Sequence, residues 1–280
     1  MLMKVKISFN ERLNMLISNK NSLLCIGLDP VPEKIPSHLR YEKNPIMLFN
    51  REIVEATKDY AVAYKANMAY YECEGQNGLE ALNDLVTQLS KDTLLILDGK
   101  RGDVPHTAER YVHAYFNLLG ADALTLSPYM GEDTIRPFLK EPEKGAFVLS
   151  LTSNDGAMDF QHLQVGMDPL YLYVAKKVNS WNENKNCGLV VSAKDIEGMK
   201  ILRGNLPEIP FLVPGVGAQG GDFKEVVKYG RDSNGTGMII NIGRDIIYAG
   251  KGTDFAKKVR ERAKYYVDEM ASVISTTWNY

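Results

Sequence analysis

The sequence predicts an α/β fold, a (β/α)8 barrel of the TIM type that forms a single domain over residues 1–280. Eight short apolar segments recur along the chain, and each is followed by a polar or glycine-containing turn and then by a longer segment with helical spacing. Strands that alternate with helices become parallel neighbours, because a parallel pair needs a crossover that is usually helical. A length of 280 residues is ordinary for such a barrel.

The expected strands are short and mostly aliphatic. They cover residues 23–28, 61–65, 94–97, 123–126, 146–151, 189–192, 211–213 and 238–242. The helices expected between them include residues 49–59, 78–89, 107–119, 170–181 and 223–229. The alternative is an open doubly wound sheet, but no G-x-G-x-x-G motif follows the first strand. The connections 31–45 and 154–169 are longer than usual and are candidate lids or rims of a site.

Composition and charge argue against several classes of protein. The formal net charge is -2, so there is no electrostatic case for binding nucleic acid or an anionic membrane. No apolar run approaches the length that crosses a bilayer. Cys25, Cys73 and Cys187 have no paired spacing, which suits a reducing compartment and argues against a structural zinc site. We therefore expect a cytoplasmic protein whose partner is a small molecule.

The central segment of the chain is LLILDGKRGDVPHTAERY, residues 94–111. Its apolar run is typical of a strand buried on both faces, and charged residues gather at its C-terminal end. Asp98 and Lys100 are two residues apart and share a face of the strand, so both can project toward one ligand, and Asp103 can return from the loop. Taken separately, Asp98 and Lys100 could form an ordinary ion pair, and Asp103 could be a helix N-cap before Pro105.

Polar residues also follow the first two strands. Asp29 lies in the GLDP segment after the first strand, and Lys65 and Asn67 lie in the KAN segment at the end of the second. An Asp before a proline is usually a turn former, and a Lys at a strand end is usually solvated. Their coincidence at successive strand ends favours a site, because a barrel carries its chemistry at that end.

Two glycine-containing segments follow the last two strands, VPGVGAQGG at 213–221 and NIGR at 241–244. Barrels often bind phosphate at these two loops, using backbone N–H groups and a nearby cation. Arg244 suits this task because a guanidinium can bind two phosphate oxygens at once. Either loop alone could simply be a tight turn, but both together favour phosphate binding.

In chain order, the motifs GLDP, KAN, DGKRGD, PGVG and IGR closely resemble those of the orotidine 5'-phosphate decarboxylase family, in the branch with a D-x-K-R-x-D motif. The resemblance spans residues 23–244. It implies a barrel that decarboxylates orotidine 5'-phosphate to uridine 5'-phosphate in de novo pyrimidine synthesis, without a metal or cofactor. The D-x-K-x-x-D part alone also occurs in sister decarboxylases and aldolases.

The resemblance also implies roles for individual residues. Lys100 would protonate pyrimidine C6 after carbon dioxide leaves, flanked by the carboxylates of Asp98 and Asp103, and Lys65 would hold Asp98. The implied substrate-binding residues are Asp29, Asn67 and Thr107 near the ribose, Ser153 at the pyrimidine, and Gln219, Gly243 and Arg244 at the phosphate. In the family, the residues that match Asp103 and Thr107 enter from the other subunit, so the resemblance implies a homodimer.

Two alternatives remain open. One is a sugar-phosphate decarboxylase or aldolase that uses magnesium to stabilise an enediolate, although the charge of Lys65 would repel such a metal. The other is a barrel that binds a nucleotide without turnover, against which Lys100 and its neighbouring carboxylates argue. An absorbance assay on orotidine 5'-phosphate separates all three.

Overall fold

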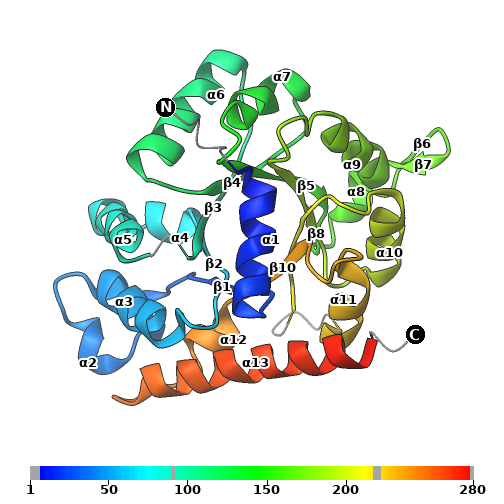
Figure 1. Ribbon diagram of the computed structural model, residues 1–280. Helices are drawn as coiled ribbons and strands as arrows, with labels where there is room; N and C mark the ends of the chain where they lie inside the picture. The colour runs from blue at the N-terminus through cyan, green and yellow to red at the C-terminus, as the bar shows by residue number, and fades with distance from the viewer. Residues whose placement is uncertain (1–6, 90–91, 217–221, 278–280) are drawn as a thin grey trace, which may run out of the picture.

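The computed structural model describes residues 7–89, 92–216 and 222–277. Eight parallel strands close into a barrel in the order β1-β10-β9-β8-β5-β4-β3-β2 (Figure 1). The strands are β1 Leu24–Gly27, β2 Ala63–Asn67, β3 Leu94–Arg101, β4 Ala123–Leu126, β5 Gly145–Leu151, β8 Cys187–Val191, β9 Phe211–Pro214 and β10 Met238–Ile242. Each of the eight segments predicted from the sequence overlaps one of these strands, which confirms the predicted barrel.

Helices surround this barrel and connect its strands. They are α1 Phe9–Lys20, α2 Ser37–Arg40, α3 Pro45–Thr57, α4 Ala69–Glu72, α5 Gly75–Gln88, α6 Pro105–Val112, α7 Glu132–Ile135, α8 Ala157–Phe160, α9 Leu170–Ser180, α10 Ile196–Asn205, α11 Phe223–Gly230, α12 Arg244–Ile247 and α13 Phe255–Thr277. Helix α6 was expected to run on to residue 119 as one α-helix, but it continues as a π-helix, His113–Leu118.

Helix α1 lies across the N-terminal end of the barrel, as Figure 1 shows. The Asn10 side-chain amide donates to the carbonyl of Cys187, the first residue of β8, at 3.1 Å. The side-chain Oδ1 of Asn14 accepts from the N–H of Gly237, immediately before β10, at 3.2 Å. Because these partners are backbone groups at the start of strands, α1 closes this end of the barrel and satisfies polar groups that the strands leave there.

Phe9 anchors α1 to the barrel core. Its ring packs edge-on against Phe147 of β5, with 5.8 Å between the ring centroids. A Cβ at Gly145, the first residue of β5, would lie 2.4 Å from the Phe9 ring. Only glycine therefore allows this approach, and the filled N-terminal end leaves the opposite end of the barrel for a site.

The two long connections predicted to be lids or rims contain short elements. The first holds the 3-10 helix η1 Pro32–Lys34 and α2. The second holds α8 and a two-stranded hairpin, β6 Gln164–Val165 and β7 Asp168–Pro169, which projects from the barrel in Figure 1. The long helix α13, which was not predicted, packs against α3, α11 and α12.

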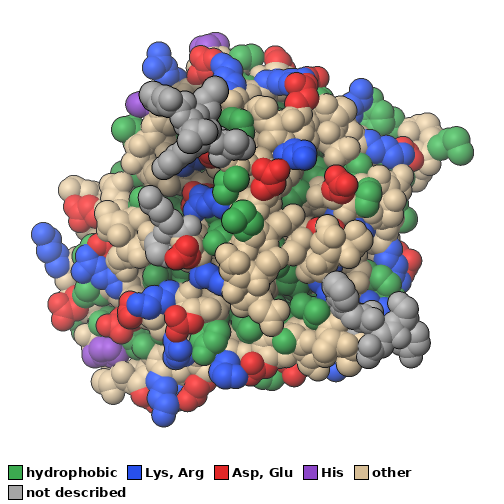
Figure 2. Space-filling model, viewed as in Figure 1, with side chains coloured by type: hydrophobic (Ala, Val, Ile, Leu, Met, Phe, Trp, Pro, Cys, Tyr) green, Lys and Arg blue, Asp and Glu red, His purple; other side chains and the backbone are tan. Residues whose placement is uncertain are grey.

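The outer surface agrees with the near-zero net charge. Acidic and basic side chains are interspersed on the face that carries α1 (Figure 2). Within the described ranges, no helix combines the length and apolar character needed to cross a membrane.

Candidate active site

A cavity of about 460 Å³ opens at the end of the barrel opposite α1. Its walls come from the C-terminal ends of the strands and the loops that follow them. The predicted site residues that line it are Asp29, Lys65, Asn67, Asp98, Lys100, Ser153, Gly243 and Arg244. Residues from distant parts of the chain therefore meet in one cavity, as the strand-end argument predicts.

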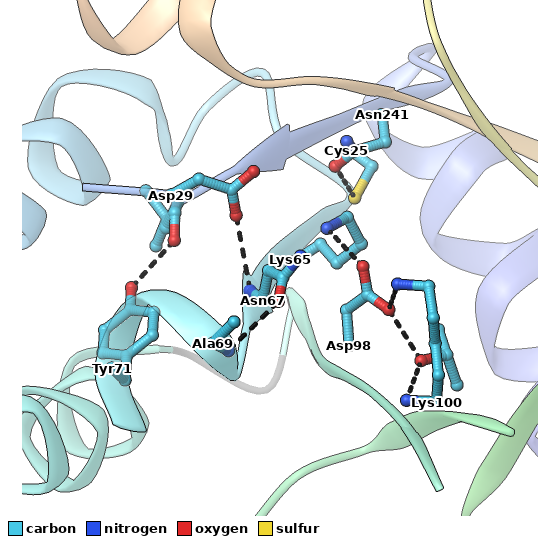
Figure 3. A network of polar contacts seen from close by, with 11 residues as sticks. Cys25, Asp29, Lys65, Asn67, Ala69, Tyr71, Asp98, Lys100 and Asn241 are labelled. Carbon is cyan, nitrogen blue, oxygen red and sulfur yellow. Dashed lines mark hydrogen bonds and ion pairs between the residues drawn. The ribbon is translucent and has the colours of Figure 1, made fainter. Parts of the chain in front are cut away.

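Three charged side chains form the centre of this site. Asp98 lies between two ammonium groups: its Oδ2 is 3.0 Å from Lys65 Nζ and its Oδ1 is 2.7 Å from Lys100 Nζ (Figure 3). The side chains of Lys65 and Asp98 are 5% and 10% exposed, whereas that of Lys100 is 49% exposed. We call this set the Lys–Asp–Lys array. Its buried part is a fixed ion pair, and its accessible part is an ammonium.

The array is ionised at neutral pH. Burial by itself raises the pKa of Asp98, but the adjacent ammonium groups of Lys65 and Lys100 outweigh burial and hold this pKa well below its usual range. Burial by itself lowers the pKa of Lys65, but the carboxylates of Asp98 and Asp29 outweigh burial, so the pKa of Lys65 lies above its ordinary value. The array therefore carries two positive charges and one negative charge.

The backbone at the end of β3 is irregular, and it places Lys100. The register of β3 against β4 shifts between Leu97 and Arg101, and Lys100 adopts a left-handed conformation with φ 46°. Thr125 of β4 holds this irregularity, because its Oγ1 accepts from the Lys100 N–H at 2.9 Å and donates to Asp98 Oδ1 at 2.7 Å. A left-handed non-glycine residue at a bulge is typical of functional sites.

Asp29 and Asn67 form the wall on the β1 and β2 side of the cavity. The Asn67 N–H donates to Asp29 Oδ1 at 3.4 Å, and Asn67 Oδ1 accepts from the N–H of Ala69 at 3.1 Å (Figure 3). The carboxylate of Asp29 and the side-chain amide of Asn67 lie along the cavity, where a ribose hydroxyl could bind.

Gly243 and Arg244 lie at the β10 side of the cavity. A Cβ at Gly243 would lie 3.3 Å from the carbonyl oxygen of Gly27, so the two strand ends approach closely. Arg244 is exposed, and its guanidinium has no hydrogen-bond or ion-pair partner within residues 7–89, 92–216 and 222–277. Gln219 and the glycines around it, also predicted at the phosphate, lie outside the described residues.

Asp103 and Thr107 are the predicted site residues that do not line the cavity. Asp103 Oδ1 accepts from the N–H of Val104, the next residue, at 2.8 Å. Val104 occupies the N-cap position of α6 and makes no side-chain cap bond, so the interpretation of Asp103 as the N-cap is wrong. Its carboxylate therefore lies beside the start of α6 and does not line the cavity of its own chain.

Several residues of the cavity were not predicted. They are Thr125, Thr152, Asn154, Gln161, Asn241 and Asp245. Gln161 holds the turn before Ser153, because its Oε1 accepts from the Thr152 N–H at 2.8 Å and its Nε2 donates to Thr152 Oγ1 at 2.7 Å. Thr125 could have been predicted from the sequence, because it is the polar residue of an otherwise apolar strand. Gln161 lies in an irregular segment, where no sequence pattern marks it.

The donor set offers little to a metal ion. Within the described ranges, no three or more His, Cys, Asp and Glu side chains are grouped so that they could hold one.

Comparisons with known sequences identify relatives of this chain. A sequence model of the orotidine 5'-phosphate decarboxylase / HUMPS family matches residues 22–259. The chain is 42% identical over 269 residues to orotidine 5'-phosphate decarboxylase of Flavobacterium johnsoniae, covering 95% of this chain and 98% of the relative. It is 45% identical over 246 residues to the same enzyme of an Azoarcus species, covering 87% and 91%.

Solved structures with similar folds and sequences bear related names. OMP decarboxylase of Leishmania donovani superposes with a TM-score of 0.83 at 36% identity, covering 95% of this chain and 98% of that chain. UMP synthase of the same organism gives 0.85 at 38% identity, and the match covers 96% of this chain but 57% of that longer chain. From the extent of the family match and the identity to full-length relatives, this chain belongs to the orotidine 5'-phosphate decarboxylase / HUMPS family.

Proposed function

We propose that this chain catalyses the decarboxylation of orotidine 5'-phosphate to uridine 5'-phosphate, in which the carboxylate on C6 leaves as carbon dioxide and is replaced by a proton. The reaction belongs to pyrimidine synthesis. The observation that carries the proposal is the Lys–Asp–Lys array in the same cavity as Arg244. Relatives that share more than two fifths of their residues with this chain, and most of its length, bear the name of this enzyme.

The array supplies what this reaction needs. When the C6–carboxylate bond breaks, carbon dioxide leaves and the electron pair stays on C6, so negative charge develops on the ring. The net positive charge of the array stabilises that charge, because preorganised charges act strongly where water is excluded. Lys100 Nζ then donates a proton to C6, and solvent returns a proton to Lys100. Its exposed side chain allows both transfers.

Asp98 and Lys65 prepare Lys100 for this role. Asp98 holds the Lys100 ammonium in position through the 2.7 Å ion pair. Lys65, buried behind Asp98, fixes the carboxylate in place. The barrier reduction required is on the order of 20 kcal/mol, and binding of the remote phosphate supplies part of it.

We assign the remaining contacts of the substrate to the binding residues predicted from the sequence. Arg244 and Gly243 bind the phosphate, together with Gln219. Asp29 and Asn67 bind the ribose, and Ser153 binds the pyrimidine. Arg244 supports this assignment, because a guanidinium at the rim of a cavity with no ion-pair partner in the described part of the chain is available to an anion.

We also propose that the active form is a homodimer in which Asp103 and Thr107 of the partner subunit complete each site. Both residues lie outside the cavity of their own chain. The loops after β3 and β4 are joined by the Ser127 N–H to Arg101 carbonyl bond at 2.8 Å, and Val104 and Met130 on these loops are exposed. Exposed apolar residues beside a site are typical of an interface.

Turnover by the Lys100→Ala variant tests the proposed function. We expect the absorbance change of orotidine 5'-phosphate to slow by at least about a thousandfold, because both the cation and the proton donor are lost. Alanine is preferred to glycine, since glycine would also relax the left-handed backbone at this position.

Binding and a control complete this test. Calorimetry should still detect uridine 5'-phosphate bound to Lys100→Ala, because the phosphate contacts lie on other strands. Lys140→Ala, an exposed lysine paired with Glu109, should keep wild-type turnover. Near-normal turnover by Lys100→Ala would reject the assignment.

A further inference from the structure

Asp245 is a carboxylate in an unexpected place. It follows Arg244 directly in α12 and, like Arg244, lines the cavity. A phosphate bound by Arg244 would therefore lie near a negative charge of the protein. An uncompensated carboxylate at this point would repel the phosphate and could also pair with the Arg244 guanidinium.

Two side chains of α13 engage this carboxylate. Asp245 Oδ2 accepts from Arg262 Nε at 2.7 Å and from the Tyr266 hydroxyl at 2.6 Å. The Arg262 guanidinium also lies over the Tyr266 ring, 5.0 Å from its centroid. Burial by itself raises the pKa of Asp245, but the bonds from Arg262 and Tyr266 outweigh it and lower this pKa. The carboxylate is therefore ionised and held on the side of α13.

We propose that Arg262 and Tyr266 are positioning residues for phosphate binding: Arg262 neutralises Asp245, and both residues hold its carboxylate toward α13, so that Arg244 stays available to the substrate. The inference rests on the proposed function and adds to it a role for α13. The family match ends at residue 259, so Asp245 lies within the match, whereas Arg262 and Tyr266 lie beyond it.

The test compares variants that remove the neutralising charge with variants that remove the need for it. Arg262→Leu should raise KM for orotidine 5'-phosphate and the inhibition constant of uridine 5'-phosphate by about fivefold, the scale of one partly exposed ion pair. It should leave kcat within about twofold, because the Lys–Asp–Lys array is untouched. Arg262→Lys should retain most of the wild-type affinity, since the charge remains.

A second substitution separates charge from packing. In the double variant Arg262→Leu with Asp245→Asn, the unneutralised carboxylate is gone, so KM should return to within about twofold of wild type. The matched control is Arg260→Leu, which removes an exposed α13 arginine paired with Asp59, away from the cavity, and should leave KM unchanged. Thermal unfolding of each variant checks that it is folded.

The outcomes are distinct. If the wild type is active and Arg262→Leu leaves KM unchanged, the inference is overturned but the proposed function stands. A raised KM that Asp245→Asn does not restore would show that Arg262 acts by packing, and would overturn it too. A wild type without turnover of orotidine 5'-phosphate would reject the proposed function, and the inference with it.

Discussion

Asp98 receives hydrogen bonds from both lysines of the array and from Thr125, and these bonds make its carboxylate a source of pH-dependent stability. Its pKa in the folded chain lies below the value of about 4 expected in the unfolded chain. The unfolded chain therefore binds one proton more than the folded chain between these two values. The contribution of Asp98 is fully present above the unfolded pKa and is lost as pH falls toward the folded pKa.

This linkage predicts the behaviour of Asp98→Asn. The variant should be less stable than wild type at pH 6, because it leaves the buried Lys65 without its counter-charge. Below about pH 4 its free energy of unfolding should fall less steeply than that of wild type, by about 1.4 kcal/mol per pH unit, since one linked proton is removed. Urea unfolding of both proteins from pH 3 to pH 6 measures the two slopes, and parallel curves below pH 4 would contradict the prediction.

At the scale of single residues, the expectation that a barrel carries its site at the C-terminal ends of its strands predicted the charged centre of the site. It did not predict the residues that hold that centre in place. Asp29, Lys65, Asp98 and Lys100 stand at the ends of apolar runs, so their positions could be predicted from the sequence. The bulge that places Lys100 could not be predicted, because it depends on Thr125 of a neighbouring strand. The residue pattern within one strand does not give its register against the next strand.

Among the structural elements, α10 carries an arginine in its last turn, Arg203, that joins it to two neighbouring elements. The Arg203 guanidinium donates to the carbonyls of Gly230 at 2.7 Å and Gly237 at 2.9 Å, and it lies 3.7 Å from the centroid of the Phe211 ring. Burial lowers the pKa of Arg203 to about 10, so it remains a cation at neutral pH. Its Nε and Nη2 groups thus hold the end of α11 and the start of β10 together.

Removing this arginine should destabilise the fold. We expect Arg203→Met to lower the free energy of unfolding by about 3 kcal/mol, because several buried carbonyls lose their donors. Arg260→Met, the exposed arginine of α13, should change it by less than about 1 kcal/mol. Denaturant unfolding of the two variants checks this, and equal losses would contradict the assigned role of Arg203.

The elements that were predicted and those that were missed differ in one physical respect. The strands and the helices between them follow the alternation of a (β/α)8 barrel, which identifies each by its neighbours. Helix α1 precedes the first strand and α13 follows the last, so each of them has a barrel strand on one side only. A capping box at Ser8 and Glu11 marks the start of α1, and buried Phe255, Val259 and Ala263 have helical spacing in α13. Neither pattern predicts that α1 closes the barrel or that α13 contacts Asp245, since both depend on tertiary contacts.

For the whole molecule, the proposed homodimer makes a prediction about mixed subunits. Lys100→Ala and Asp103→Ala should each be inactive alone, but mixing them should restore activity. One site of a heterodimer combines both defects, and the other receives an intact Lys100 and an intact Asp103. Random exchange makes about half of the dimers mixed, by the symmetry of a twofold interface, so about a quarter of the sites should work.

The same mixture tests where Asp103 acts. If each Asp103 served its own chain, every site in the mixed dimer would lack one residue. Subunit exchange is followed by mass or by pull-down of a tagged chain. Activity that stays at the level of the separate variants after exchange would reject the shared site.

The contacts of α1 also bear on how the chain is made. Asn14 is bound to Gly237, 223 residues later, and β1 pairs with β10 through Cys25 and Asn241. On the ribosome, α1 and β1 emerge before Gly237 and β10. Until β10 leaves the exit tunnel, one edge of β1 has no native partner to cover it, and α1 lacks its bond to Gly237. The barrel therefore cannot close before β10 has emerged, and the open edge of β1 is the part of this chain that a chaperone would need to shield.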